Sequence, residues 1–402
     1  MCQRNIPQNN GSVVTDYQLD SNNKSDSEFF QEHVEKIGPQ EEKTIISADG
    51  AYSGEENTEL AAKNNIDLVT TDLTGRDVDP VMGAFELNED GTVYTDVLRG
   101  AKQTDTYIAT GDDRDLDFWA PLFTYHGFRY CQVTGLDYLE PEMIDAWLIH
   151  TDLENRSSFR SGSPMINAIQ DALVMTERDN MHSILTDCPQ RDERMAWMND
   201  ATVRFEETPY NFDASRMLPK ILQDIKNEQR AEGQFTCCSP YIYGGLPADP
   251  VCSSYLVAAK EALMHYGELG AVDEFFDGMA AWEDFLLSRS CNPDLGEGLV
   301  DYTYYGDWAG PAYACPSLEY AVSAVTPGLL MSTGYSYYNC KLLADFARRT
   351  GRTEAEAKYT AEAARVRAAF LKKWFNPETG VVAEGSMGGQ AFALWLGILP
   401  AE

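Results

Sequence analysis

The chain has 402 residues and a formal net charge of −33, which results from 31 basic and 64 acidic side chains. Such a negative charge argues against binding to nucleic acid or to an anionic membrane surface, and no run of about 18 apolar residues could cross a bilayer. With 44% hydrophobic residues and nine cysteines that lack metal-ligand spacing, we expect a globular protein of two or three domains in the cytoplasm.

Residues 1–90 differ from the rest of the chain and predict a small α/β segment. Residues 44–52 and 66–71 are typical of short apolar strands, and residues 53–64 are typical of a helix between them. Asp49 lies in the string DGAY at the end of the first strand. This string resembles the middle of the transposases that hold two metal ions with two aspartates and one glutamate.

That resemblance leaves two interpretations of Asp49 open. It is either the second aspartate of a transposase remnant or an ordinary acidic residue at the end of a strand. The first aspartate and the final glutamate have no counterpart in context, so we do not expect transposition by this chain. We expect residues 1–90 to be a foreign segment that joins the remainder within residues 85–91.

Residues 91–152 favour strands, because aromatic and β-branched side chains alternate there with glycine and aspartate. The residues expected in these strands are Val93, Tyr94, Thr106, Tyr107, Ile108, Trp119, Phe123, Tyr125, Phe128, Tyr130 and Val133.

Beyond residue 152 the pattern becomes helical. Ser163 and Pro164 suit the start of a helix whose apolar stripe is Met165, Ile169, Ala172 and Leu173. Helices are also expected over 255–266, 272–287 and 390–399, and Thr353 with Glu356 predicts a capping box before another. Paired helices joined by loops rich in glycine and proline describe an α/α toroid, which carries its site in the loops at one end.

The segment 187–200 (DCPQRDERMAWMND) holds the densest group of chemically useful side chains. If its second half is helical, Glu193, Trp197 and Asp200 share one helix face. Asp187 and Arg191 would lie beside them in the preceding loop. Crowded carboxylates repel one another, so we expect at least one to keep its proton near neutral pH. Acids, an arginine and an aromatic ring in one pocket suit a sugar, whereas a solvated acidic helix end is the alternative.

This segment resembles the signature of the bacterial α-L-rhamnosidases, glycoside hydrolase family 78. It departs from that signature at Ala196 and Asn199, where the family usually has glycine. Residues 118–130 (FWAPLFTYHGFRY), 305–308 (YGDW) and 333–338 (TGYSYY) resemble further elements of the family, in the same order. The resemblance runs from about residue 92 to residue 402.

The resemblance implies a mainly α fold with three parts. An incomplete (α/α)6 toroid at 153–402 would follow the last strands of a β-sandwich at 91–152, the concanavalin-like domain of the family. The small transposase-like α/β segment at 1–90 would precede both.

Roles of individual residues also follow from the resemblance. Glu193 matches the general acid that protonates the glycosidic oxygen, and Asp187, Arg191, Trp197 and Asp200 match residues around the rhamnose. Trp308 matches a further aromatic contact, and Asp307 is expected either to contact the ligand or to orient a neighbour.

Other readings stay open for several of these acids and their neighbours. Asp200 could instead cap a helix or pair with Arg194. Asp192 is expected to be solvated or paired, and His182 and Cys188 to have structural roles.

The resemblance implies hydrolysis of terminal α-L-rhamnosides with inversion, without cofactor or metal. The partner is then a rhamnose-containing glycoside, not nucleic acid or a membrane. The family's general base lies in a late barrel loop that has no counterpart up to Glu402, so we expect impaired activity and uncovered apolar residues at Phe392, Leu394 and Trp395. A rhamnoside-binding protein without catalysis and a transposase remnant remain the alternatives.

Overall fold

The computed structural model describes residues 3–5, 12–13, 26–40, 43–48, 55–70, 92–109, 111, 118–136, 138–310 and 322–400. Asp49 and the expected junction at 85–91 lie outside these residues. The chain divides into two compact units, one formed by residues 1–99 and 128–148 and the other by residues 100–127 and 149–402.

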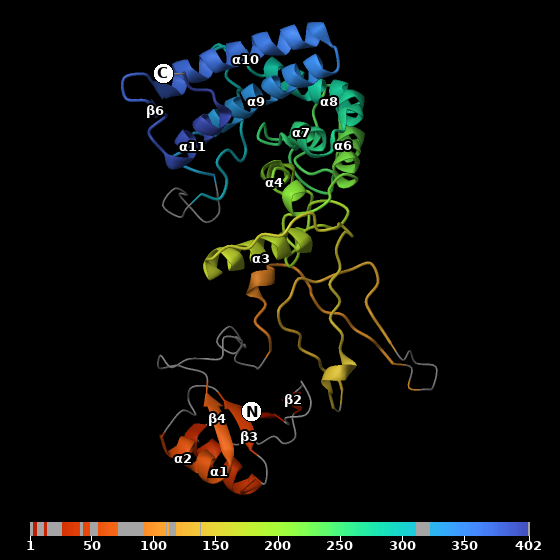
Figure 1. Ribbon diagram of the computed structural model, residues 1–402, viewed down its shortest axis with the longest axis vertical. Coiled ribbons are helices and arrows are strands. Elements are labelled where there is room, and N and C mark those ends of the chain that lie inside the picture. Colours follow the sequence, from red (N-terminus) through yellow and green to blue (C-terminus); the bar gives the residue numbers. More distant parts are fainter. Residues whose placement is uncertain are drawn as a thin grey trace. The chain divides into compact units, whose positions relative to one another are not determined.

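The first unit contains a small α/β layer (Figure 1). Strands β1 (Gln3–Asn5), β2 (Ser12–Val13), β3 (Thr44–Ala48) and β4 (Ile66–Thr70) form a sheet in the order β2-β1-β3-β4. Helix α2 (Glu55–Lys63) connects the parallel pair β3 and β4, whose register places Thr44 opposite Ile66. The predicted strand–helix–strand pattern is therefore confirmed within the described residues.

Helix α1 (Asp26–Ile37) is an element that the sequence analysis did not anticipate. It supplies Phe30 and Val34 to a small core with Ile46, Ala61 and Ile66, all of them buried. Its first residues follow a polar stretch, and the helix is stabilised by packing on α2 rather than by a strong local signal.

Between residues 92 and 152, the described part of the chain contains the 3₁₀ turns η3 (Asp96–Leu98) and η4 (Pro141–Met143) but no β-strand. The strands expected there are thus wrong for the described residues. High β-propensity indicates a side chain that fits a pleated, half-buried surface, and it produces a strand only where a partner strand pairs with it. Ile108 and Phe123 instead lie exposed.

The second unit is helical, as predicted. It contains α3 (Pro164–Asp179), α4 (Met198–Arg204), α5 (Thr208–Asn211), α6 (Met217–Glu228), α7 (Ser254–Tyr266), α8 (Leu269–Ser288), α9 (Gly328–Arg349), α10 (Thr353–Trp374) and α11 (Met387–Leu396). A two-strand ribbon of β5 (Phe375–Asn376) and β6 (Val381–Val382) separates α10 from α11.

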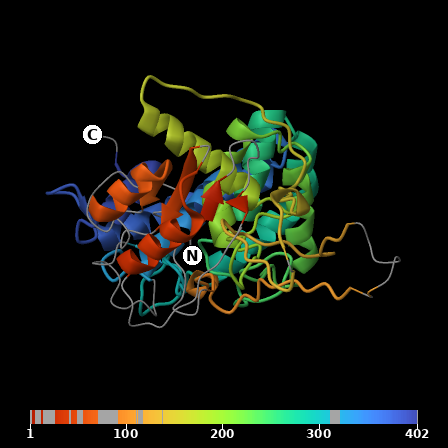
Figure 2. The ribbon, with the colours of Figure 1, turned by 90° about the horizontal axis from the view of Figure 1, so that it is seen from below.

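These helices form two layers. Each helix from α6 to α10 packs on the next, and α7 contacts α9 while α6 contacts α8 (Figures 1 and 2). Helices α7 and α9 are buried around much of their circumference and form the inner layer, whereas α8 and α10 each expose a charged face. Helix α11 packs on α9. Alternation of buried and amphipathic helices along the chain is consistent with an (α/α)6 toroid.

Aromatic packing ties the two layers together. Trp282 of α8 is fully buried, and its ring centroid lies 4.4 Å from that of Phe235. Tyr255 of α7 contacts the same phenylalanine edge-on at 6.3 Å. None of the helices in the described part of the chain combines the length and the apolar character that a membrane crossing requires.

Two details of the helical prediction are corrected. The apolar stripe expected on α3 is not buried, since Met165 and Ile169 are exposed and Glu177 is the buried residue of that helix. Its carboxylate accepts a hydrogen bond from Asn211 of α5, so a polar contact anchors α3.

Helix α10 is confirmed, and Thr353 is its first helical residue. The capping box predicted for Thr353 and Glu356 is wrong, because this helix has no side-chain cap. At the C-terminal helix, Phe392 is buried, whereas Leu394 and Trp395 are exposed as expected.

Candidate active site

The loop 187–197 is closed by two hydrogen bonds between Asp187 and Met195. The Asp187 amide donates to the Met195 carbonyl at 3.0 Å, and the Met195 amide donates to Asp187 Oδ1 at 2.8 Å. Arg194 has a φ of 53°, in the left-handed region. A side-chain acceptor for a backbone amide and a left-handed residue are both incompatible with a continuous helix.

The helix expected from Glu193 onward is therefore wrong. Helix α4 begins only at Met198, so Asp200 lies in its first turn while Glu193 and Trp197 belong to the loop. Asp187, Arg191 and Glu193 still lie together, but the loop brings them together instead of a shared helix face.

Arg191 lies at the centre of this loop. Its Nη2 is 2.6 Å from Glu193 Oε2 and 3.6 Å from Asp187 Oδ2, and its Nε donates to Cys188 Sγ at 3.3 Å. The Asp187 side chain is 5% exposed and that of Glu193 is 26% exposed. One guanidinium thus neutralises two carboxylates that would otherwise repel each other, and it leaves Glu193 accessible from solvent.

Asp187, Cys188 and Glu193 place an oxygen, a sulfur and an oxygen atom within 4.8 Å of one another, which is a spacing that could hold a metal ion. The Arg191 guanidinium contacts the side chains of all three residues. A metal ion would have to displace that arginine and ionise Cys188, whose thiol pKa is raised by burial. The structural role expected for Cys188 is thus consistent with its surroundings.

Asp200 is exposed to solvent, although other protein groups lie near its carboxyl. Loss of hydration raises the pKa of its carboxyl, and the negative charges of Asp187 and Glu193 act in the same direction. The ion pairs of the described residues include none between Asp200 and Arg194, and α4 has no side-chain cap. The Asp200 carboxyl does interact with its own backbone amide in the first turn of α4, so a structural role at the start of this helix stays open beside a place in the acidic cluster.

Aromatic rings form a continuous row that begins at Trp197, the last residue of the loop. The Trp197 and Tyr305 ring centroids lie 6.1 Å apart, and those of Tyr305 and Trp308 lie 5.2 Å apart, both edge-on. Tyr243 contacts the other side of Trp197 at 6.3 Å. Trp197 and Trp308 were predicted to be site residues, whereas Tyr305 and Tyr243 were missed as such. Tyr305 stands in the recognised YGDW string and could have been found there, but Tyr243 carries no sequence signal.

Asp307 is directed toward the beginning of α11. A Cβ atom placed on Gly388 would lie 2.8 Å from Asp307 Oδ2 and 3.1 Å from Thr326 Oγ1. Thr326 in turn donates a hydrogen bond to Ser386, the N-cap residue of α11. A carboxylate at this end of a helix is favoured by the helix dipole, so the geometry supports an orienting role for Asp307.

Tyr125 supports the acidic loop through contacts with Arg194 and His182. Arg194 Nη1 donates to the Tyr125 carbonyl at 2.7 Å, and its guanidinium lies 5.2 Å from the centroid of the Tyr125 ring. That ring stacks on His182 at 3.9 Å, and His182 Nε2 is 3.0 Å from the Asp179 carbonyl oxygen. Burial lowers the pKa of His182. The structural role predicted for His182 agrees with these contacts.

Gly127 and Gly100 also lie close to the acidic loop, at Gln190 and Asp192. A Cβ atom on Gly127 would lie 2.9 Å from the Cβ atom of Gln190, and one on Gly100 would lie 2.7 Å from Asp192 Oδ2. Asp192 is exposed, and its carboxylate lies close to the backbone of Gly100.

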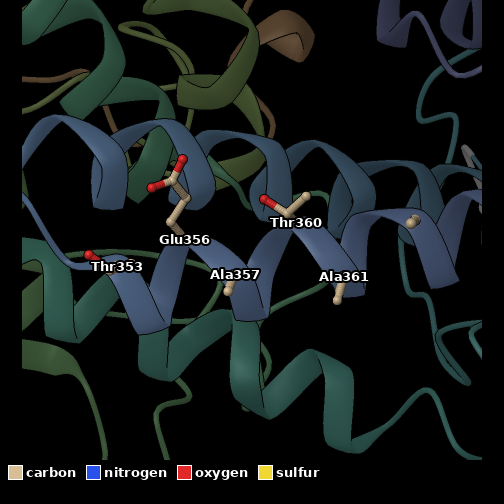
Figure 3. Close-up of a pocket in the computed structure, with 6 residues that line it drawn as sticks. Thr353, Glu356, Ala357, Thr360 and Ala361 are labelled. Carbon is tan, nitrogen blue, oxygen red and sulfur yellow. The ribbon is translucent and has the colours of Figure 1, made fainter.

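A shallow hollow also lies along the exposed side of α10 (Figure 3). It is lined by threonine and alanine side chains with Glu356 as the single charged residue. One carboxylate without a second acid, a cation or an aromatic ring offers no catalytic arrangement, so the loop 187–197 remains the candidate site.

Comparisons with known proteins identify the family of the chain. Residues 154–402 match the bacterial alpha-L-rhamnosidase 6 hairpin glycosidase domain, and residues 65–150 match the bacterial alpha-L-rhamnosidase concanavalin-like domain. The second match begins inside the segment 1–90, whose foreign origin stays a prediction.

Individual relatives show the same likeness. An α-L-rhamnosidase of Streptomyces avermitilis is 29% identical over 317 residues, which make up 78% of this chain and 29% of that protein. The structure of the α-L-rhamnosidase from Dictyoglumus thermophilum has a TM-score of 0.67 and 30% identity, covering 79% of this chain and 35% of that one. The structure of the Streptomyces avermitilis enzyme complexed with L-rhamnose has a TM-score of 0.66 and 27% identity. The match covers 79% of this chain and 29% of that one.

The chain spans about a third of the length of the relatives that it matches. The six-hairpin match nevertheless covers more than half of the chain and contains the whole acidic loop with its aromatic row. This protein belongs to the bacterial α-L-rhamnosidase family.

Proposed function

We propose that this chain hydrolyses terminal α-L-rhamnosides with inversion of the anomeric centre. The observation that carries the proposal is the convergence of Asp187, Arg191 and Glu193 in one closed loop beside the Trp197 ring. A relative with the same fold has been solved with L-rhamnose, which supports this choice of sugar.

In this proposal Glu193 takes up a proton as it leaves its ion pair with Arg191, and it then acts as the general acid that donates this proton to the glycosidic oxygen as the bond breaks. Of Asp187 and Glu193, Glu193 is the more exposed to solvent. Asp187 accepts the hydrogen bond from the Met195 amide that closes the loop. Proton donation to a leaving oxygen is worth about 10²–10⁴-fold in rate. Inversion also requires a carboxylate about 6.5–9.5 Å from the acid, to make room for the attacking water. We assign that role to no described residue.

The remaining polar residues would bind the sugar. Rhamnose is neutral, and its hydroxyl groups need both donors and acceptors, which Arg191, Asp187 and Asp200 supply. The rings of Trp197 and Trp308 offer an apolar surface to the face of the sugar that bears the methyl group. Both the acids and the rings belong to the second, helical unit.

The test is hydrolysis of p-nitrophenyl α-L-rhamnoside by the purified chain, with p-nitrophenyl β-D-glucoside as the control substrate. We expect release of p-nitrophenol from the rhamnoside alone. Proton NMR of the early product should show β-rhamnose before mutarotation, whereas α-rhamnose would contradict inversion. Calorimetric titration with L-rhamnose separates the outcomes without turnover. Heat would indicate a rhamnoside-binding protein, and no heat would contradict the proposal.

A further inference from the structure

Asp249 is a buried carboxylate outside the acidic loop. It lies just before helix α7 and has no exposed surface. Its Oδ1 accepts a hydrogen bond from the Val251 amide at 3.0 Å, and its own carbonyl accepts one from the Cys252 amide at 2.9 Å. Burying a carboxylate is expensive unless hydrogen bonds replace its lost water, so the partners of its second oxygen are informative.

The second oxygen, Oδ2, accepts hydrogen bonds from the segment 303–305. Asp249 Oδ2 accepts hydrogen bonds from the Tyr304 amide, from the Tyr305 amide at 2.9 Å and from Thr303 Oγ1 at 3.3 Å. The ion pairs of the described residues do not include Asp249, so amide and hydroxyl donors alone compensate its charge. Three donors from consecutive residues on one oxygen fix the direction of the backbone there.

The fixed backbone carries the middle of the aromatic row. The Tyr305 ring contacts Trp197 on one side and Trp308 on the other. The Tyr302 hydroxyl adds a second attachment nearby, since it donates to the Ala248 carbonyl at 2.9 Å. A shift of the 303–305 backbone would therefore move Tyr305 and, through it, Trp308.

We propose that Asp249 is a positioning residue for the sugar site, whose carboxylate holds Tyr305 and Trp308 in register with Trp197. The inference rests on the proposed function, because it assigns the aromatic row to sugar binding. Asp249 does not touch the substrate in this account. It acts through the amides of Tyr304 and Tyr305.

An asparagine cannot replace this carboxylate, although it has the same shape. If its carbonyl oxygen faces Tyr304 and Tyr305, its amino group faces the Val251 amide, so two donors oppose each other. If it is turned round, the amino group meets three donors from residues 303–305 instead. Both orientations leave a buried donor without an acceptor, and a neutral acceptor binds amides less strongly than a carboxylate.

The test compares the Asp249→Asn variant of the full chain with Asp301→Asn as a matched control. Asp301 lies two residues before the segment 303–305, and its carboxylate pairs with the half-exposed Arg289. We expect the Kd for L-rhamnose to rise about tenfold or more in Asp249→Asn, while the control stays within about twofold of wild type. Hydrogen–deuterium exchange should increase selectively in peptides that cover residues 303–308.

A structural role alone would give a different result. If Asp249→Asn lowers the melting temperature but leaves both the rhamnose Kd and the exchange of residues 303–308 unchanged, the positioning role is overturned. If Asp249→Asn fails to fold, the same measurements are made on Thr303→Val, which removes only one of the three donors to Asp249 Oδ2. A rise in Kd of about two- to fivefold with faster exchange at 303–308 supports the role, and wild-type values overturn it.

The same experiment distinguishes the positioning role from the proposed function. If the wild-type chain binds no rhamnose, the proposed function fails, and the exchange data alone judge Asp249. Faster exchange confined to 303–308 still assigns it to holding the aromatic row, whereas unchanged exchange rejects that assignment.

Discussion

Arg191 and Glu193 form a direct ion pair, with 2.6 Å between Nη2 and Oε2, and the same guanidinium lies 3.6 Å from Asp187 Oδ2. This arrangement explains how two acids can share one small loop in a strongly negative protein. It also makes Arg191 the residue whose loss should disturb both acids at once.

Replacing Arg191 with methionine should weaken rhamnose binding and lower kcat/KM by about 10- to 100-fold, because a charge-assisted hydrogen bond contributes roughly 1.5–3 kcal/mol. The melting temperature should also fall, because the Asp187 carboxylate is 5% exposed and loses the positive charge beside it. Steady-state kinetics and calorimetry check this. Arg160→Met is the control, because Arg160 pairs with Asp171 at the exposed surface. Equal effects of the two substitutions would contradict the role of Arg191.

Trp308 and Trp395 make a matched pair, because both rings are 46% exposed. Only Trp308 belongs to the aromatic row that begins at Trp197. Trp308→Ala should raise the Kd for rhamnose by about 2- to 10-fold, which corresponds to the 0.5–1.5 kcal/mol of an aromatic contact. Trp395→Ala should leave the Kd unaltered. A larger loss with Trp395→Ala would place the sugar elsewhere.

Gly334 brings α9 and α11 into close contact. A Cβ atom on this residue would lie 2.3 Å from a ring carbon of Phe392 and 2.8 Å from Leu396 Cδ1. Gly334→Ala should therefore reduce the free energy of unfolding by about 1–3 kcal/mol. Gly270 of α8 has open space around it, so Gly270→Ala should raise the same quantity by about 0.5–1 kcal/mol. Urea denaturation measures both, and a stable Gly334→Ala variant would argue against this helix packing.

Glu283 predicts how stability depends on pH. The side chain is fully buried between α8 and α9, with hydrogen bonds from Ser336 Oγ at 2.5 Å and Cys340 Sγ at 3.4 Å. Burial raises its pKa from 4.5 to about 8. The folded state therefore binds this proton more tightly than the unfolded state does.

Its stabilising effect is complete below pH 4.5 and declines as the pH rises from 4.5 to about 8, by up to about 1.4 kcal/mol per pH unit. Glu283→Gln keeps the neutral shape and removes the titration. The variant should match wild type near pH 5 and exceed its melting temperature near pH 8. If the difference in melting temperature between Glu283→Gln and wild type is the same at pH 5 and pH 8, Glu283 does not titrate in this way.

The helical half of the molecule could be predicted because its signals are local and repeated. Gly267, with a φ of +72°, ends α7 where the sequence placed a break, and the apolar residues of α7 and α8 recur at helical spacing. The strand–helix–strand unit of the first 70 residues was predictable for the same reason. These elements are specified by residues close to one another in the chain.

The features that were missed depend on long-range contacts. The aromatic residues at 119–130 have high β-propensity, yet pairing with a second strand decides whether they form one. Likewise the loop 187–197 follows from the bond between Asp187 and Met195 and from the support of Tyr125, which is far away in sequence. The motif identified the site residues by resemblance, but it carried no information on Asp249 or Tyr243.

The most direct test of the account is the leaving-group dependence of Glu193→Gln, with Asp192→Asn beside it as the control. A general acid matters most where the leaving oxygen is strongly basic. We therefore expect Glu193→Gln to lower kcat/KM for methyl α-L-rhamnoside by about 10²–10⁴-fold, and that for p-nitrophenyl α-L-rhamnoside far less, while L-rhamnose still binds. Asp192→Asn should leave both substrates near wild-type rates. Equal losses for the two substrates, or no loss for either, would contradict the role of Glu193 as proton donor.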